Sequence, residues 1–271
     1  MRSDPFPVPF PRRLASGERL MWITPERVFY AGLLGEPSMH TRGSLTVHVA
    51  AEAPLKLRLQ GGEWQTAEVA VVQPGRPYQV ACEGRHAIGL LLEPETVDPA
   101  RLPELLRANG AVRAPAFAAH VRQCHARMVA AGAGLDLRPA DFDPLFFGAP
   151  LAARPLDPRI AAVLERLRAD PSAALSAHDG ARQAGLSFSR FLHLFREQAG
   201  VPFRSLRSWK RARSLLHHVS AAPPLVDLAL DIGYPDSSHF SHSIRQSYGL
   251  KPRDIVAGSR KLRVIAQAAM A

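Results

Sequence analysis

The chain has 271 residues, of which 46% are hydrophobic, and this is enough for one or two domains with packed cores. Its net charge is +10 and is uneven, because residues 155–271 carry 17 Lys and Arg against 9 Asp and Glu, whereas residues 1–154 carry 17 against 15. The basic C-terminal part suits a polyanion such as nucleic acid. The lack of any run of 18 apolar residues argues against a membrane span, and two cysteines give no disulfide framework or thiolate metal site.

The N-terminal third of the sequence has the pattern of a β domain. Residues 1–20 are rich in proline and lack the apolar core of a signal peptide, so we expect an extended arm and a cytoplasmic protein. Over residues 21–97, short apolar runs alternate with glycine and proline, which is typical of a small barrel or sandwich. The predicted strands are Arg27–Leu33, Leu45–Ala50, Leu55–Leu59, Glu68–Val72, Tyr78–Ala81 and His86–Leu92.

One stretch of this domain resembles a known family. Q-P-G-R-P-Y-Q-V, residues 73–80, is similar to the turn before a late strand of cupin-like sensor domains. A metal-binding cupin carries an H-x-H pair, because divalent metals bind imidazole and carboxylate on facing strands. That pair is broken here, since Arg42 stands two residues after His40, although His48 and His86 could complete a site. We expect no metal and no cofactor, and a barrel that holds a small organic effector or is purely structural.

The next two segments are predicted to be helical and then irregular. Residues 98–134 carry apolar side chains at three- and four-residue spacing, as between Phe117 and Met128 in a helix over 115–131. Such helices pack either on their own barrel or against a second subunit. Residues 135–157 are rich in Gly, Pro and Asp, so we expect a linker there.

Two copies of one pattern occupy residues 158–258. In each copy a short helix ends at a glycine, Gly185 or Gly233, which adopts the left-handed conformation without a Cβ penalty. A capping residue, Ser187 in the first copy and Asp236 or Ser237 in the second, then opens a second helix with an apolar inner face, which is the layout of a helix-turn-helix. A bundle of αα-hairpins is the alternative. A long helix over residues 204–219 is expected to join the copies. The inner face of the first copy is predicted at Phe188, Phe191, Leu194 and Phe195.

The tandem pattern resembles the DNA-binding domain of AraC-type transcriptional regulators. The segments that carry the resemblance are G-L-S at 185–187, G-V-P-F at 200–203, I-G-Y-P-D-S-S-H-F-S at 232–241 and G-L-K-P-R-D at 249–254. The resemblance implies a domain that reads two successive major-groove segments, commonly behind a cupin-like sensor and with dimerisation through the intervening helices. The departures from the family pattern are Gly180 for a usual Leu, Ile244 for a usual Phe, and Leu192 at a frequently polar reading position.

The outward faces of the two second helices carry hydrogen-bonding side chains of the kind that bind base edges and phosphates. The predicted base-reading residues are Ser189, Arg190, His193, Ser238, His239 and His242. The predicted phosphate-binding residues are Arg196, Arg211, Arg245, Lys251 and Arg253, and Arg211 matches an arginine usual in the family. The basic tail over residues 259–271 is expected to be solvated.

The sequence thus predicts an α+β multidomain fold, with an N-terminal cupin-like β-barrel plus helices and a C-terminal all-α domain. We predict a non-enzymatic regulator that binds promoter or operator DNA as a homodimer, responds to a small-molecule effector, and contacts RNA polymerase if it activates. Two other classes stay open. They are a cupin-type metal-dependent enzyme fused to a DNA-binding domain, and a non-specific DNA-bending protein.

Overall fold

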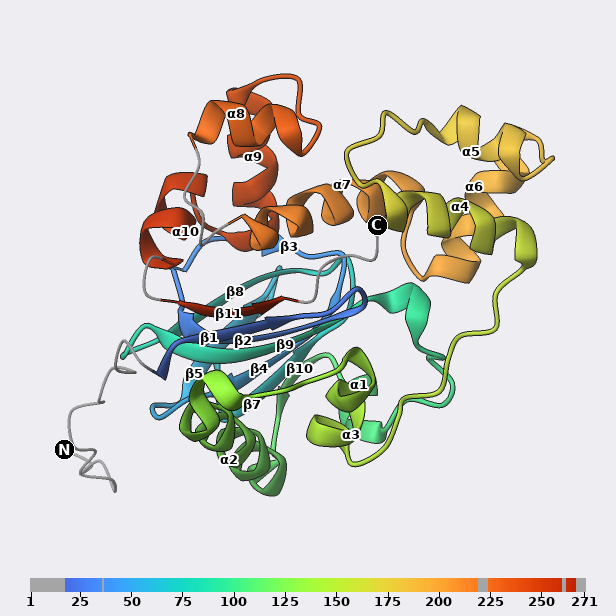
Figure 1. The fold of residues 1–271 in the computed structure, drawn as a ribbon. Helices are drawn as coiled ribbons and strands as arrows, with labels where there is room; N and C mark the ends of the chain where they lie inside the picture. The colour runs from blue at the N-terminus through green and yellow to red at the C-terminus, as the bar shows by residue number, and fades with distance from the viewer. Residues whose placement is uncertain (1–17, 36, 219–223, 260–261, 267–271) are drawn as a thin grey trace.

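The computed structural model describes residues 18–35, 37–218, 224–259 and 262–266 (Figure 1). The predicted N-terminal arm lies almost wholly outside the described residues. Two layers of β-sheet make up the N-terminal part, and helices cover them above and below. Among the helices that the structure describes, none is both long and apolar enough to cross a membrane.

The strands form two sheets, so within the described residues the sandwich form of the predicted β domain is present and no closed barrel is seen. The larger sheet has the order β10-β7-β4-β9-β2-β1-β11 and the smaller one β3-β8-β5-β6. All six predicted strands are present to within one residue. The strands are β1 Leu20–Ile23, β2 Arg27–Leu33, β3 His40–Thr41, β4 Leu45–Ala50, β5 Leu55–Leu59, β6 Gln65–Ala67, β7 Val69–Val72, β8 Pro77–Cys82, β9 His86–Leu92, β10 Gly110–Val112 and β11 Arg263–Ala266.

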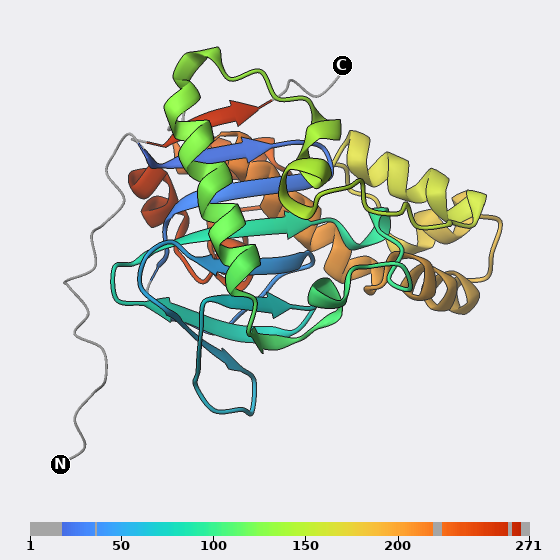
Figure 2. The same cartoon turned by 90° about the horizontal axis from the view of Figure 1, so that it is seen from below.

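Three short to medium helices pack below the larger sheet. They are α1 Glu104–Arg107, α2 Pro115–Ala131, which has the predicted bounds, and α3 Phe142–Phe147. Figure 2 shows α2 crossing the strands of this sheet. Helix α3 corrects the prediction of a linker over residues 135–157, because Phe142 and Phe146 are buried with Trp22 in the core of the sheet. The Gly- and Pro-rich composition of residues 135–157 does not indicate this short helix or its two buried phenylalanine side chains.

Within the described residues, seven α-helices form the C-terminal part. They are α4 Pro158–Ala169, α5 Ala177–Gln183, α6 Phe188–Ala199, α7 Phe203–Ser214, α8 Leu225–Asp231, α9 Ser237–Tyr248 and α10 Pro252–Ser259. The predicted connecting helix is α7, which is shorter than expected because it ends at Ser214 and continues as a 3₁₀ turn over Leu215–His217. Residue 219, its predicted end, lies outside the described residues.

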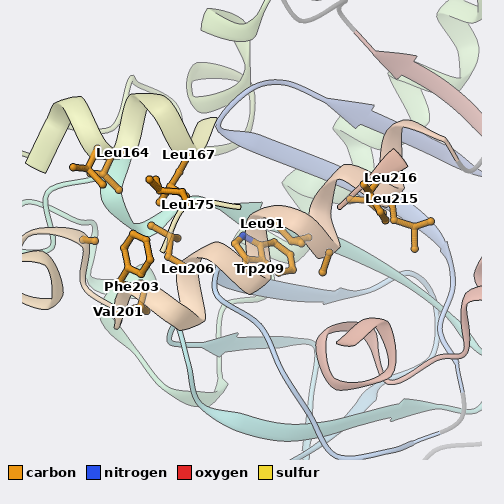
Figure 3. Close-up of a cluster of buried hydrophobic side chains, with 14 of the residues drawn as sticks. Leu91, Leu164, Leu167, Leu175, Val201, Phe203, Leu206, Trp209, Leu215 and Leu216 are labelled. Atoms are coloured by element: carbon orange, nitrogen blue, oxygen red, sulfur yellow. The ribbon is translucent and has the colours of Figure 1, made fainter. Parts of the chain in front are cut away.

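The two parts share one hydrophobic core. Met21, Ile23 and Val28 of the larger sheet belong to the same buried cluster as the apolar faces of the C-terminal helices. Figure 3 shows Leu91 of β9 beside Trp209 of α7. The C-terminal helices therefore lie against the sheet on the side opposite α2, rather than on a free tether (Figure 1).

The segment that follows α10 corrects the prediction of a solvated tail. Residues 263–266 form β11, which pairs in parallel with β1 at the edge of the larger sheet, in a register that places Leu20 opposite Arg263 and Ile23 opposite Ala266. Residues 260–261 and 267–271 lie outside the described residues. A four-residue strand carries too little periodicity to be recognised from its sequence alone.

Candidate nucleic-acid interface

The two predicted turns have the same backbone hydrogen bonds. After α5, the N–H of Leu186 donates to the carbonyl of Ala181 (3.0 Å) and that of Gly185 to Arg182 (3.1 Å). After α8, Tyr234 donates to Ala229 and Gly233 to Leu230, both at 2.9 Å. Both glycines have positive φ, +63° and +83°, as this helix-terminating motif requires. The expectation that both glycines end a helix and turn the chain into a second one is confirmed.

The second helix of each copy begins at the predicted cap. Ser187 accepts a hydrogen bond from the N–H of Arg190 at the start of α6. Asp236 accepts from the N–H groups of Ser238 and His239, both at 2.8 Å, at the start of α9. Hydrogen bonds from the backbone and the side chain of His239, and from the backbone of Ser238, lower the pKa of the Asp236 carboxyl. This carboxyl is therefore ionised at neutral pH.

Gly180, which departs from the family pattern, leaves room for an aromatic ring. A Cβ placed on Gly180 would lie 2.6 Å from the Phe191 ring. Phe191 is fully buried and packs against Phe195 and Phe203 at centroid distances of 5.6 Å. The Phe191 ring thus occupies the space that the side chain of a leucine at position 180 would fill.

All six predicted base-reading residues and four of the five predicted phosphate-binding residues are exposed. Ser189, Arg190, His193 and Arg196 lie on the outer side of α6, and Ser238, His239, His242 and Arg245 on that of α9. Lys251 and Arg253 are exposed at the start of α10. His239 is the most constrained of them, because its Nδ1 lies 2.7 Å from the carboxylate of Asp236. The DNA-binding roles of these residues stay predictions.

Two apolar side chains also lie on the outside of α6. Phe188 was predicted on the inner face, but it is 41% exposed and stacks on the His178 ring at a centroid distance of 4.1 Å. Leu192 is 36% exposed. Phe188 directly follows the Ser187 cap, where no preceding turn of the helix covers it. The prediction from helical periodicity that Phe188 lies on the buried face is therefore wrong.

Arg211 does not lie with the other predicted phosphate-binding residues. Its guanidinium donates to the carbonyls of Pro171, Ser172 and Ala173 at 2.9–3.2 Å. A Cβ on Gly233 would meet the Ser172 carbonyl oxygen at 2.4 Å, so the second turn packs on this same loop. Arg211 therefore holds the loop after α4 against the second helix-turn-helix, and its contact with DNA phosphate stays a prediction.

The family described as "Helix-turn-helix domain" matches residues 181–257. The Invasion protein InvF of Salmonella typhi and that of Salmonella typhimurium are each 36% identical over 72 residues. The chain carries an AraC-type DNA-binding domain. The match covers 26% of this chain and 33% of the InvF proteins, so the chain spans about a third of the length of the curated relatives it matches.

Solved structures resemble the whole arrangement of two domains. Apo ToxT from Vibrio cholerae, in a variant form, has a TM-score of 0.57 at 13% identity, covering 86% of this chain and 97% of that one. ToxT with a bound unsaturated fatty acid has a TM-score of 0.52 at 10% identity, covering 88% and 97%. At such identity the likeness shows the fold, namely a β-rich N-terminal domain with an AraC-type helical domain behind it.

A buried ion cluster joins the AraC-type domain to the larger sheet. The Lys210 ammonium of α7 lies 2.7 Å from a Glu93 oxygen and 2.5 Å from a Glu95 oxygen. Arg213 lies 3.0 Å from Glu93, and the Trp209 indole N–H donates to Glu93 at 3.0 Å. Arg213 also donates to the carbonyls of Thr24 and Arg27, and all these side chains are under 10% exposed.

The charges in this cluster are interdependent. Burial opposes ionisation of Glu93, but Lys210 and Arg213 hold the pKa of its carboxyl below the usual value. Burial raises the pKa of Glu95 despite Lys210, and Glu93 adds to the rise. Burial works against the charge of Lys210, and the two carboxylates nevertheless raise its pKa. No local pattern indicates this cluster, because its partners lie far apart in the chain and Lys210 fits the pattern of an ordinary basic helix.

The histidines considered for a metal site are arranged around a tyrosine instead. His48 Nε2 lies 3.0 Å from the Tyr78 hydroxyl, and the His40 ring packs on Tyr78 with a centroid distance of 4.2 Å. Burial and the neighbouring Arg42 lower the pKa of His40 to about 3, and the same causes lower that of His48 well below its usual range. His86 Nδ1 contacts the carbonyl of Gly84. In the described parts of the chain, no group of three or more His, Cys, Asp or Glu could hold a metal.

A cavity lies between the sheets and the second helix-turn-helix. Its volume is about 100 Å³, and its walls include Arg42 and His48 from the sheets, Tyr248 and Leu250 at the end of α9, and Ile255 and Leu262. Arg42 donates to the carbonyl of Ser247 (3.2 Å), and its guanidinium lies 5.7 Å from the centroid of the Tyr248 ring. The Ser38 hydroxyl donates to the carbonyl of Gly249 (2.7 Å). The cavity is thus walled by both domains.

Proposed function

We propose that this protein is a sequence-specific DNA-binding transcriptional regulator with an effector-binding N-terminal domain. The observation that carries the proposal is the pair of matching turns, each followed by a capped helix whose outer side bears exposed polar side chains. We further propose that it acts in the cytoplasm as a homodimer formed through residues 98–134, and that it contacts RNA polymerase where it activates.

The exposed side chains divide into two kinds of DNA contact. His242, exposed on the outer side of α9, would contact base edges, and Arg245, exposed in the last turn, would neutralise phosphate. A base contact discriminates between sequences by about 1–3 kcal/mol, and a phosphate contact contributes equally to every sequence with a salt slope of about one unit.

The test begins with selection of a binding site from random DNA, followed by titrations at several salt concentrations. His242→Ala should relax the preference at one or two base pairs. Arg245→Ala should weaken all sequences alike and reduce the salt slope by about one. Arg76→Ala, which removes an exposed charge from the turn between β7 and β8 of the N-terminal domain, is the control and should change neither. Uniform weakening by both helix variants would refute the division, and failure to select any site would favour a non-specific DNA-bending protein.

We also propose that the effector is an amphipathic molecule with an apolar body and a carboxylate, held in the cavity between the domains. Its walls are mostly apolar, Arg42 supplies a cation, and His48 is neutral because its pKa is lowered. The solved structure of ToxT with an unsaturated fatty acid is in keeping with this chemistry. A hydrogen bond to a charged group contributes about 1.5–3 kcal/mol, so Arg42 should discriminate an acid from an alcohol.

Native mass spectrometry of the purified protein should first report the subunit number and any retained small molecule. Titration with a C16 unsaturated fatty acid and with the matching alcohol should then give tighter binding of the acid. Arg42→Gln should weaken binding of the acid about tenfold or more and leave the alcohol unchanged, since 1.4 kcal/mol corresponds to a factor of ten. Arg58→Gln, on strand β5 of the smaller sheet and outside the cavity lining, is the control. Equal loss for acid and alcohol would contradict a carboxylate contact at Arg42.

A further inference from the structure

The residues after α10 return to the N-terminal domain. Residues Leu262 to Ala266 are hereafter called the C-terminal strap. They consist of Leu262 and strand β11, which is added to the edge of the larger sheet (Figure 1). Figure 2 shows this strand at the sheet edge beside β1, next to the end of α2. The N–H of Arg263 donates to the carbonyl of Arg19 at 3.1 Å. The strap thus joins the end of the AraC-type domain to the larger sheet of the N-terminal domain.

The strap packs against both cores of the molecule. Val264 packs on the core shared by the two domains, and Ile265 packs on the core below the larger sheet. The Arg263 guanidinium donates to the carbonyl of Met128 in the last turn of α2 at 2.6 Å. Carbonyls at a helix C-terminus lack intrahelical partners, so a cation there is favourable. These contacts are specific, and they place the strap in contact with α2 and both domains.

The strap also supplies a wall of the cavity. Leu262 is 8% exposed and lines the cavity together with Gly258 and Ser259 at the end of α10. The cavity volume of about 100 Å³ is smaller than the roughly 150 Å³ of an engineered cavity that binds benzene. An amphipathic effector larger than benzene therefore fits only if part of the wall moves.

The strap is the wall that moves at the least free-energy cost. The neighbouring wall strands β2, β4 and β9 pair on both sides within the larger sheet, whereas β11 pairs with β1 alone among the strands that the structure describes, over four residues and in parallel. A short parallel pair at an edge is among the weakest units of a sheet, and such units open at lower free energy than the core. The end of α9 is held separately by Ser38 and Arg42.

We propose that the C-terminal strap is a gate on the effector cavity, whose detachment from β1 admits the effector and at the same time releases α10 from the edge of the larger sheet. The inference rests on the proposed effector site. It adds a defined moving part, and it gives residues 262–266 a regulatory role.

The experiment fixes the strap covalently. Ile23 and Ala266 are partners in the β1–β11 register, so Ile23→Cys/Ala266→Cys, in a background with Cys82→Ser and Cys124→Ala, places the two thiols for a disulfide across the pair. Stopped-flow fluorescence of cis-parinaric acid, an unsaturated fatty acid probe, measures association. The oxidised protein should bind at least tenfold more slowly than the same protein after reduction, which is the matched control. A chain truncated after Ser259 should bind faster than the full chain.

Equal association rates for the oxidised and reduced forms would overturn the gate while leaving the effector site intact. If none of the forms binds the probe, the proposed effector site fails, and hydrogen exchange of the β1 amides in the full-length protein then decides on the strap alone. Exchange of Leu20 to Ile23 well before that of β4 and β9 would support a detachable strap. Exchange of all these strands together would overturn it, and neither measurement requires the truncated chain to fold.

Discussion

The substitution Lys210→Met tests the attachment of α7 to the N-terminal domain, through the ion cluster with Glu93 and Glu95. It keeps the length and apolar stem of the side chain but removes the ammonium that lies 2.7 Å from Glu93 and 2.5 Å from Glu95. Glu93 retains Arg213 at 3.0 Å and the Trp209 indole. Glu95 loses the cation beside its Oε1 atom, and its Oε2 atom already has no hydrogen-bond partner among the described residues. The cost of the substitution therefore falls mainly on Glu95.

The size of the effect follows from protonation of Glu95. Without Lys210, the folded-state pKa of this carboxyl rises further above its usual 4.5, so the folded protein takes up a proton rather than bury an unpaired charge. At pH 7 this uptake sets a ceiling of about 3.4 kcal/mol, from 2.5 pH units at 1.36 kcal/mol each. Removing one partner of a buried ion pair typically destabilises by about 3–5 kcal/mol, so we expect about 3 kcal/mol.

The sign of the pH dependence identifies the cause. A carboxyl whose pKa is raised on folding destabilises the protein only where the unfolded chain would ionise, so the penalty of Lys210→Met is small near pH 4.5 and increases toward pH 7. Urea unfolding followed by tryptophan fluorescence should give a loss of about 0.7 kcal/mol at pH 5 and about 3 kcal/mol at pH 7. Arg204→Met, on the exposed side of the same helix, is the control and should cost under about 0.5 kcal/mol. A loss that is equal at both pH values would refute the reasoning.

Three further variants probe the AraC-type domain. Arg211→Ala removes three hydrogen bonds to carbonyls, so it should lower the free energy of unfolding by about 2 kcal/mol and weaken DNA binding without changing the salt slope; a reduced slope in the titrations would restore a phosphate contact. Gly233→Ala should destabilise by about 1–3 kcal/mol in thermal unfolding, because φ is +83° and the new Cβ would meet the Ser172 carbonyl oxygen. Gly180→Leu should cost about 1–3 kcal/mol through displacement of Phe191, and a neutral result would mean that the ring has room to shift.

The helix-turn-helix elements were predictable because their signals are local. A cap such as Ser187 or Asp236, and a glycine that must adopt positive φ, fix the start and end of a helix within a few residues of chain. The six predicted strands likewise follow from short apolar runs between turns. Phe188 is the local failure, since a period of 3.6 residues assigns a side to each residue but does not say where the burying surface ends.

The contacts between the domains were not predictable in the same way. Glu93 and Lys210 each follow an ordinary local pattern, and only the packing of α7 on the larger sheet turns them into a buried pair. Strand β11 needs β1 to be a strand at all, because four residues cannot show which partner they have. The cavity between the domains is lined by residues from both of them, and no motif in the sequence indicates it.

The two attachments act on different parts of the AraC-type domain. Helix α7 lies between the two helix-turn-helix units and packs on both, so we expect a change at the ion cluster to affect α6 and α9 together. The strap follows α10, and Arg42 and Ser38 hold the end of α9, so a change at the cavity acts on the second unit alone. Footprints on the selected DNA should separate these routes. Effector binding should alter protection over the half-site of α9 and leave that of α6, whereas Lys210→Met should weaken both, and an effector response confined to the half-site of α6 would contradict this division.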